Sequence, residues 1–334
     1  MTTTATLALP RSIYIEPTSR CNEFCQQCPR TLLSREDDRD LSFEKFRQIV
    51  DQFPVLERVV LHGLGEPLLN KELPLMIRYL KERGVYVLFN SNGIALTARK
   101  GQELIDAGLD EYRLSMDGAT RETYAHIRGV DAFEKIWRNV GRFISLQKEQ
   151  NASKPAVSLW FTAMRENLRE LPRLIELAHQ HGVPEIYLQR LVYFEQGLAA
   201  SKQALFHRST PEELALIRRC EETCREYGIV FKAAGASTPL QSITQDFGAR
   251  PWSGCRRPYS LTYITSSGNV LSCCFAPFGH RSAREYYEER VLGNVFQEPI
   301  EQIWRGERYN AFRRAFESDH PARHCSQCGV NWSY

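Results

Sequence analysis

Several features that would mark a membrane protein or a nucleic-acid-binding protein are missing from this sequence of 334 residues. No apolar run approaches the length that a helix needs to span a bilayer. The 43 lysine and arginine residues nearly balance the 40 aspartate and glutamate residues. A net charge of +3 is too small to indicate nucleic acid or an anionic membrane surface as a partner. Low-complexity segments and solenoid-type repeats are absent as well.

A secretion signal is also missing, since the first ten residues have no cationic segment and only a short apolar stretch, Leu7–Pro10. The chain nevertheless contains ten cysteines. Without a secretion signal, this number of cysteines favours a reducing compartment and metal ligation over disulfides. We therefore expect a cytoplasmic protein, whose length allows one large domain and a smaller one.

From residue 12 to about residue 192 the sequence alternates short apolar strands with amphipathic helices. The predicted strands are Ser12–Pro17, Arg58–His62, Val85–Asn90, Glu111–Met116, Ala156–Met164 and Glu185–Val192. The predicted helices include Ser42–Gln52, Lys71–Arg83, Thr97–Ala107, Ala132–Gln147 and Leu168–His181. This alternation predicts an α/β fold with parallel strands joined by crossover helices. Six such units form either an open doubly wound sheet or part of a (β/α)8 barrel, and in both the chemistry lies at the C-terminal strand ends.

The pattern changes after a further predicted helix, Pro211–Tyr227, which begins with a capping box formed by Thr210 and Glu213. Two short strands, Leu261–Thr265 and Asn269–Cys273, are spaced as a hairpin, and two helical segments follow them. We therefore expect a separate small domain in the C-terminal part of the chain.

Three cysteines, Cys21, Cys25 and Cys28, follow the first predicted strand with the spacing C-x3-C-x2-C. Soft thiolates placed so close together select iron–sulfur clusters or zinc. Four thiolates would saturate a 4Fe-4S cube or a tetrahedral zinc ion, but this loop supplies three. A structural zinc ion would need a fourth ligand from elsewhere, and coincidental buried thiols are unusual in a polar loop. The spacing therefore favours a cluster with one open iron.

This segment resembles the signature of the radical S-adenosylmethionine (SAM) superfamily. The resemblance implies a partial (β/α)6 TIM-like barrel over residues 12–227, after an N-terminal tail of residues 1–11. In that family the three cysteines hold a 4Fe-4S cluster, whose open iron binds the amino and carboxylate groups of SAM. One residue departs from the pattern, because relatives carry an aromatic or apolar residue before the third cysteine, where this chain has Gln27.

Three further segments, each at the end of a predicted strand, are similar to motifs of the same family. The segment from Gly63 to Glu66 resembles a Gly-Gly-Glu motif near the methionine amino group, and the segments around Asn92 and Ser115 resemble motifs near the ribose and the sulfonium. The SAM-binding residues implied by the resemblance are Gly63, Gly65, Glu66, Asn92, Ser115 and Asp117. An alternative stays open, since the same residue types also suit the turns that end strands.

A second cysteine group resembles the SPASM/twitch extension. Cys255 and Cys273 enclose a C-x12-G-x4-C element, and Cys325 and Cys328 follow near the end of the chain. The resemblance implies a small twitch/SPASM-like iron–sulfur domain over residues 228–334, in which these four cysteines ligate an auxiliary 4Fe-4S cluster. Structural zinc with the same four thiolates is the alternative.

Three other cysteines stay unassigned in this interpretation. Cys274 is adjacent to Cys273, and His324 is an alternative ligand at the same place. Cys220 and Cys224 lie four residues apart on one face of a predicted helix, where buried thiols without a ligand role are the favoured interpretation.

The resemblance implies an oxidoreductase-type enzyme that cleaves SAM reductively to a 5′-deoxyadenosyl radical, which then abstracts a hydrogen atom from the substrate. The auxiliary cluster would accept the second electron, and a one-electron donor such as a flavodoxin or a ferredoxin would reduce the first cluster. Because the first strand begins near residue 12, leaving no room for a leader-binding domain, we expect a small polar metabolite rather than a peptide as the substrate. The alternatives are a peptide or protein maturase and, in another class, a non-catalytic zinc-binding module.

Overall fold

One ten-stranded sheet, in the order β10-β9-β8-β1-β2-β3-β4-β5-β6-β7, forms the centre of the protein. The computed structural model describes residues 7–33, 37–235, 238–246, 248, 250–278, 285–326 and 328. The strands are β1 Ser12–Ile15, β2 Arg58–Val60, β3 Tyr86–Ser91, β4 Glu111–Ser115, β5 Ala156–Ala163, β6 Glu185–Arg190, β7 Val230–Ala233, β8 Leu261–Ile264, β9 Asn269–Leu271 and β10 Gly293–Asn294. Neighbouring strands from β8 through β1 to β7 pair in parallel, whereas β9 pairs antiparallel with both β8 and β10.

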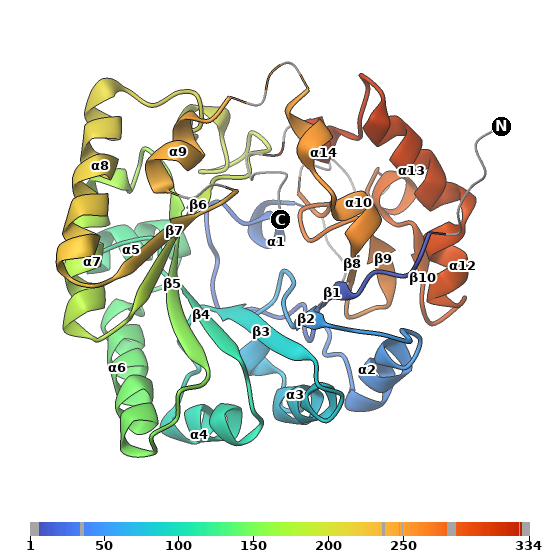
Figure 1. The fold of residues 1–334 in the computed structure, drawn as a ribbon, viewed down its shortest axis with the longest axis horizontal. Coiled ribbons are helices and arrows are strands. Elements are labelled where there is room, and N and C mark those ends of the chain that lie inside the picture. Colours follow the sequence, from blue (N-terminus) through green and yellow to red (C-terminus); the bar gives the residue numbers. More distant parts are fainter. Residues whose placement is uncertain are drawn as a thin grey trace.

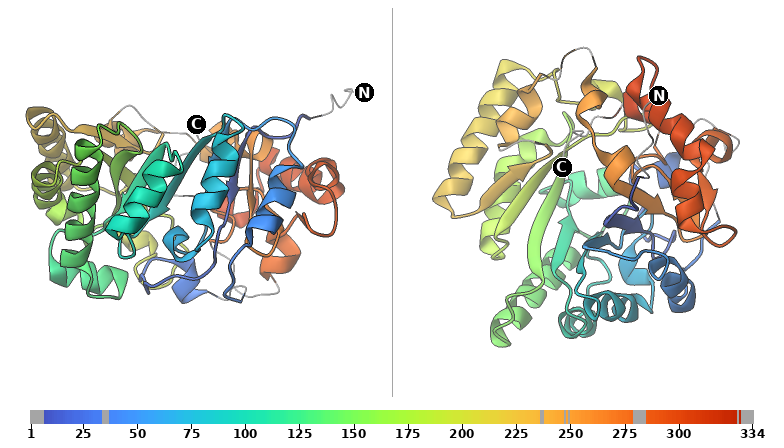
Figure 2. Two further views of the ribbon diagram at one scale, coloured as in Figure 1. Left: turned by 90° about the horizontal axis from the view of Figure 1, so that it is seen from below. Right: turned by 45° about the vertical axis from the view of Figure 1, so that its right-hand side comes forward.

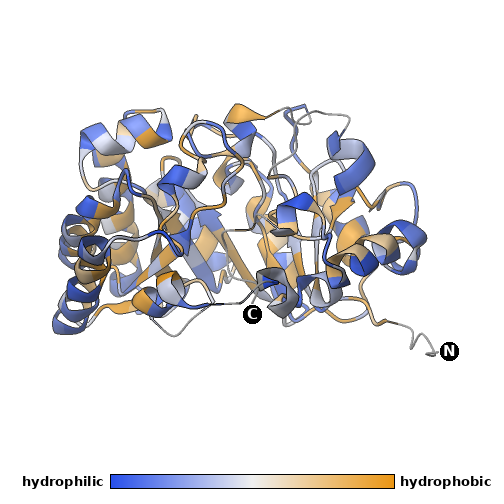
Figure 3. Ribbon diagram, turned by 90° about the horizontal axis from the view of Figure 1, so that it is seen from above, coloured by the Kyte–Doolittle hydropathy of each residue, from blue (hydrophilic) through white to orange (hydrophobic). Residues whose placement is uncertain are grey.

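The sheet is curved, and helices cover its outer face (Figure 1). The helices are α1 Pro29–Leu32, α2 Phe43–Val50, α3 Leu73–Lys81, α4 Ala98–Asp106, α5 Arg121–Arg128, α6 Phe133–Glu149, α7 Leu171–Gln180, α8 Pro211–Glu226, α9 Pro239–Thr244, α10 Arg257–Ser260, α12 Ile300–Arg305, α13 Glu307–Glu317 and α14 Arg323–Ser326. Further views show the same arrangement, with α2, α3 and α4 side by side along one side of the sheet (Figure 2). The main core fills the layer between strands and helices, and the helices turn hydrophilic residues outward (Figure 3).

The α/β fold predicted from the sequence is confirmed, because all six predicted strands are present as β1 to β6 and lie in sequential order. The capping box of α8 is present as predicted, with Thr210 and Glu213 each bonding the other's backbone N–H. Several elements were not predicted, among them α5 and β7 and the short elements α1, α9, α10, α14 and β10. Helix α5 buries only Tyr124, Ile127 and Arg128, so its apolar stripe is too thin to be seen, and β7 is a four-residue edge strand that leaves Val230 exposed.

The C-terminal hairpin is also present, as β8 and β9. Strand β8 pairs in parallel with β1, in the register Tyr14↔Tyr263, so the hairpin extends the main sheet. At the opposite edge β7 pairs with β6. The sheet therefore runs without interruption across the predicted domain boundary at residues 227 and 228, and that boundary remains a prediction.

Alternate residues of each strand face the two sides of the curved sheet. In β1, Ile13 and Ile15 join the core beneath the helices, whereas Tyr14 belongs to a second apolar cluster on the concave side. In β4, Tyr112 and Leu114 likewise belong to the outer core, so Arg113, which lies between them, faces the concave side. The concave side of the sheet can therefore present polar side chains to a ligand.

A buried carboxylate ties three elements of the outer layer together. Asp110, directly before β4, accepts hydrogen bonds from the ammonium groups of Lys81 and Lys154 and from the backbone N–H of Val87. Burial raises the pKa of this carboxyl, but the hydrogen bonds from Lys154 and Lys81 outweigh it, and the net effect lowers the pKa.

Across the part of the chain that the structure describes, no helix is long and apolar enough to cross a membrane.

Candidate functional site

The three N-terminal cysteines lie in the loop after β1, and all three are free thiols. The backbone N–H groups of Phe24 and Gln26 donate to carbonyl groups of α5, which fixes this loop against the C-terminal end of that helix. Burial and the nearby Glu66 carboxylate raise the pKa of Cys21 to about 12, and burial raises the pKa of both Cys25 and Cys28. Thiols in such a setting ionise most readily when a cation binds them.

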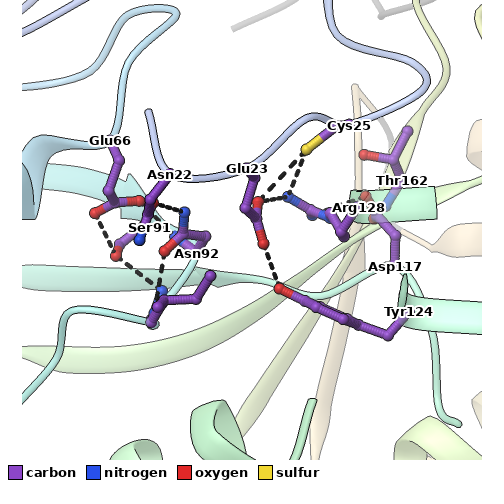
Figure 4. A network of polar contacts seen from close by, with 12 residues as sticks. Asn22, Glu23, Cys25, Glu66, Ser91, Asn92, Asp117, Tyr124, Arg128 and Thr162 are labelled. Carbon is purple, nitrogen blue, oxygen red and sulfur yellow. Dashed lines mark hydrogen bonds and ion pairs between the residues drawn. The ribbon is translucent and has the colours of Figure 1, made fainter. Parts of the chain in front are cut away.

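A buried polar network holds Cys25 in place (Figure 4). Its thiol donates to a Glu23 carboxylate oxygen 3.4 Å away, and the Arg128 guanidinium lies 3.2 Å from the same oxygen and 3.9 Å from the sulfur. Arg128 also pairs with Asp117 at 2.7 Å, and the Tyr124 hydroxyl donates to the second oxygen of Glu23. One cation thus neutralises two buried carboxylates directly beneath the cysteine loop.

The sequence analysis did not identify Glu23, Tyr124 or Arg128. Tyr124 and Arg128 belong to α5, a helix that was not predicted. Glu23 lies between two of the predicted ligands, and this position in the sequence could have indicated a role in the site.

The glycines of the predicted SAM motif are required by close packing of the chain against itself. A Cβ atom on Gly63 would lie 2.4 Å from the Glu16 side chain, and one on Gly65 would lie 2.0 Å from the Thr18 carbonyl oxygen. The Glu66 N–H donates to the Arg20 carbonyl. These contacts press the loop after β2 against the base of the cysteine loop.

Glu66 is almost fully buried, and its carboxylate organises the end of β3. It accepts hydrogen bonds from the Ser91 hydroxyl at 2.8 Å and from the N–H groups of Asn92 at 2.7 Å and Leu68 at 3.0 Å. Burial raises its pKa to about 7 despite these bonds. Because Glu66 also affects the pKa of Cys21, the second motif lies beside the first cysteine.

The structure brings Asn92 and Asp117 to the same end of the sheet, but their side chains already have partners. The Asn92 amide donates to the Asn22 side chain at 2.7 Å. Asp117 is fully buried and accepts from the backbone N–H of Thr162 at 2.8 Å and from the Gln27 amide at 2.7 Å. This contact explains the polar residue at position 27, because the Gln27 amide donates a hydrogen bond to the buried Asp117 carboxylate.

Ser115 differs from these two residues. It ends β4 on the concave side and is half-buried, and among the described residues no hydrogen bond reaches its hydroxyl group. Its hydroxyl therefore has the hydrogen-bonding capacity that a bound ligand would use.

The concave side carries a row of polar and aromatic side chains that the sequence analysis missed. Trp160 of β5 stacks on Tyr187 of β6 with ring centroids 3.9 Å apart, and the Arg113 guanidinium lies 4.3 Å from the Trp160 ring. Burial lowers the pKa of His62, after β2, to about 4, with Arg113 acting in the same direction. Its Nδ1 atom is buried without a partner among the described residues. His62 is thus an uncharged ring on the concave side, close enough to Arg113 for its charge to be felt.

The four C-terminal cysteines of the predicted set line one pocket. Cys255 precedes α10, Cys273 follows β9, and Cys325 and Cys328 lie in and after α14. Burial raises the pKa of Cys255 to about 11 and that of Cys325 well above its ordinary value, and the other three thiols raise the pKa of Cys325 further. The structure therefore gathers all four thiols at one place.

The remaining candidate ligands lie differently. Cys274 is absent from the lining of this pocket, and its thiol instead lies against Tyr14 on the concave side. Cys220 and Cys224 are buried in the main core on the inner face of α8. His324 lines the pocket, but both of its ring nitrogens are engaged by Arg290 and Ser272. Over the described ranges, no three His, Cys, Asp or Glu side chains surround a point that a single metal ion could occupy.

Comparison with known proteins agrees with this geometry. The model of the radical SAM superfamily matches residues 15–178, and the model of the SPASM iron–sulfur cluster-binding domain matches residues 255–329. The first match contains the N-terminal cysteine loop and the second contains the four C-terminal cysteines.

Curated relatives align along most of the chain. A PqqA peptide cyclase of Granulibacter bethesdensis is 24% identical over 98% of this chain and 83% of its own length. An Fe-coproporphyrin III synthase of Methanosarcina barkeri is 25% identical over 86% of this chain and 71% of its own length.

A solved structure, of native anSMEcpe with bound AdoMet, shares the fold with a TM-score of 0.66 at 16% identity, over 97% of this chain and 93% of that one. The two domains indicate a 4Fe-4S cluster, an auxiliary iron–sulfur cluster and SAM as cofactors. The chain belongs to the radical SAM superfamily and carries a SPASM iron–sulfur domain in its C-terminal part.

Proposed function

We propose that Cys21, Cys25 and Cys28 hold the SAM-binding 4Fe-4S cluster and that Cys255, Cys273, Cys325 and Cys328 hold the auxiliary one. Three free thiols on one loop, one of them buried and two half-buried, suit a cube that keeps one iron open. Four thiols around one pocket suit a fully ligated cube. When bound, the first cluster supplies one-electron cleavage of SAM to a 5′-deoxyadenosyl radical.

The remaining residues of the site position these ligands. Arg128 balances Glu23 and Asp117 beneath the cysteine loop, and Glu66 fixes the end of β3 beside Cys21. Ser115 offers a hydroxyl group to SAM from the concave side. By contrast, the paired side chains of Asn92 and Asp117 support the site rather than contact SAM, and Gly63 and Gly65 allow the two loops to pack.

The substrate that best fits the relatives is a peptide or a protein side chain. The PqqA peptide cyclase aligns over nearly the whole of this chain, and one solved structure of this fold, of native anSMEcpe, is described with a bound peptide; these two likenesses support the proposal. Our expectation of a small polar metabolite has no support in either relative, since one is named for a peptide and the other for a porphyrin. Trp160 and Tyr187 place aromatic rings on the concave side, against whose edges a peptide side chain can pack, and His62 faces the same side.

On this basis His62 is the candidate acceptor of a proton released from the substrate. It precedes the loop that packs on the cysteine loop, and it is neutral at pH 7 because its pKa is lowered to about 4. We further propose that the net reaction is oxidative, that the protein is cytoplasmic, and that a flavodoxin or a ferredoxin is the electron donor.

The test uses anaerobically purified full-length protein with dithionite, SAM and one of three additions: a short peptide encoded beside the gene, Fe-coproporphyrin III, or a polyol. We expect about eight irons per chain, and 5′-deoxyadenosine release that the peptide stimulates at least tenfold. The triple variant C21A/C25A/C28A should keep about four irons and release no 5′-deoxyadenosine. Stimulation by the porphyrin or the polyol alone would reject the peptide proposal, and retained cleavage in the triple variant would reject the ligand assignment.

A further inference from the structure

A continuous chain of hydrogen bonds reaches the wall of the C-terminal cysteine pocket from a carboxylate outside it. Glu285 accepts from the Arg290 guanidinium at 3.1 Å, Arg290 contacts His324 Nδ1, and His324 Nε2 lies 3.2 Å from the Ser272 hydroxyl. Arg290, His324 and Ser272 are all buried, and Ser272 and His324 line the pocket.

The protons in this chain can be assigned from its chemistry. A guanidinium group only donates hydrogen bonds, so His324 Nδ1 must be an acceptor and the ring hydrogen lies on Nε2. His324 Nε2 therefore donates to the Ser272 oxygen. The Ser272 hydroxyl hydrogen is then available for another acceptor, and among the described residues no such acceptor contacts it.

His324 is held in this state by its surroundings. Its ring lies parallel to Phe312, with centroids 5.7 Å apart and an interplanar angle of 6°. Because the Arg290 guanidinium donates to Nδ1, this nitrogen carries no hydrogen and the ring is neutral. Arg290 carries the positive charge of the chain and stands between the Glu285 carboxylate and His324.

We propose that the Ser272–His324–Arg290 chain directs a hydroxyl donor and a buried positive charge at the group held by Cys255, Cys273, Cys325 and Cys328, and thereby raises its reduction potential. Hydrogen bonds to cluster sulfurs and a nearby cation both stabilise the more negative, reduced state. This inference rests on the auxiliary ligand set proposed above. It gives that cluster the properties of an electron acceptor rather than of a structural crosslink alone.

The experiment uses the full chain with C21A/C25A/C28A, so that the auxiliary cluster is the one cluster present. Its reduced fraction is measured by EPR in a mediated dithionite titration, for the parent and for R290M, R290K and S272A. The control is R314M, since Arg314 on α13 is well exposed and pairs with Glu307 on the surface. Iron and sulfide are counted in each sample.

We expect R290M to shift the ratio of oxidised to reduced cluster at least tenfold toward oxidised at a fixed potential, which is about 59 mV for a one-electron couple. S272A should shift it about threefold in the same direction, R290K less than R290M, and R314M not at all. S272A decides the matter if R290M loses its iron, because removing one hydroxyl leaves the fold intact. Full iron content with ratios within twofold of the parent in S272A, and in R290M where it keeps its iron, would overturn the inference. A parent without iron would instead overturn the proposed ligand set.

Discussion

Replacing Arg128 with methionine would remove the one cation that lies between the Cys25 thiol and two buried carboxylates. The side chain is 9% exposed, and its partners Glu23 and Asp117 are 2% and 0% exposed. Methionine keeps most of the volume, so the change leaves no large cavity. What it leaves is two carboxylates without their counter-ion, at distances of 3.2 and 2.7 Å from where the guanidinium was.

The magnitude follows from the buried state of these groups. Breaking a buried ion pair by removing one partner costs about 3–5 kcal/mol, because the remaining charge is uncompensated. Asp117 keeps donors from Thr162 and Gln27, and Glu23 keeps the Tyr124 hydroxyl, so the lower part of that range applies. We expect the R128M variant to lose about 3 kcal/mol in its free energy of unfolding.

The assay is urea unfolding of the cluster-free protein, followed by circular dichroism, so that cofactor loss does not distort the transition. The matched comparison is the triple variant E23Q/D117N/R128M, in which no charge is left unpaired. It should regain at least half of the stability that R128M loses. A loss below about 1 kcal/mol in R128M, or no recovery in the triple variant, would refute the reasoning that charge balance organises this loop.

Three further predictions concern other parts of the molecule. D110N should lose about 1.5–3 kcal/mol at pH 7. Because the folded pKa of Asp110 is lowered, this stabilisation is present above the ordinary value and is lost as the pH falls through the folded pKa, so unfolding curves of D110N and the parent should converge below about pH 4. G65A should lose more than about 2 kcal/mol, measured by urea unfolding, whereas G254A, whose added Cβ meets no atom within 4 Å, should match the parent. C273S should lose about four irons per chain, whereas C274S should keep the full iron content, and equal losses in both would contradict the assignment from the pocket lining.

Local patterns predicted most of this fold, because strands, helices and caps leave marks within a few residues. The six strands and the capping box of α8 are examples. The cysteine spacings likewise predicted two thiol groups, and the structure gathers each of them. Two of the elements that were missed had weak local signals, since α5 has few apolar residues and β7 exposes one of its faces at a sheet edge.

The polar network could not be predicted in the same way. Arg128 meets Glu23 across 105 residues and Gln27 meets Asp117 across 90, and no local periodicity encodes such contacts. The role of two glycines could not be predicted either. The sequence marked Gly63 and Gly65 as turn or ligand positions, whereas the structure shows that Glu16 and the Thr18 carbonyl leave no space for a side chain there.

The relation between the two cysteine groups also depends on long-range contacts. Strand β1 leads into the first cysteine loop, and β8, which opens the hairpin that ends at Cys273, pairs with β1 along its whole length. Glu16, at the end of β1, accepts from the Leu64 N–H after β2 and from the Ser266 N–H and hydroxyl in the hairpin turn. Both thiol groups are therefore attached to one hydrogen-bonded frame. With the clusters proposed above in place, this frame would hold the two redox groups at a constant separation.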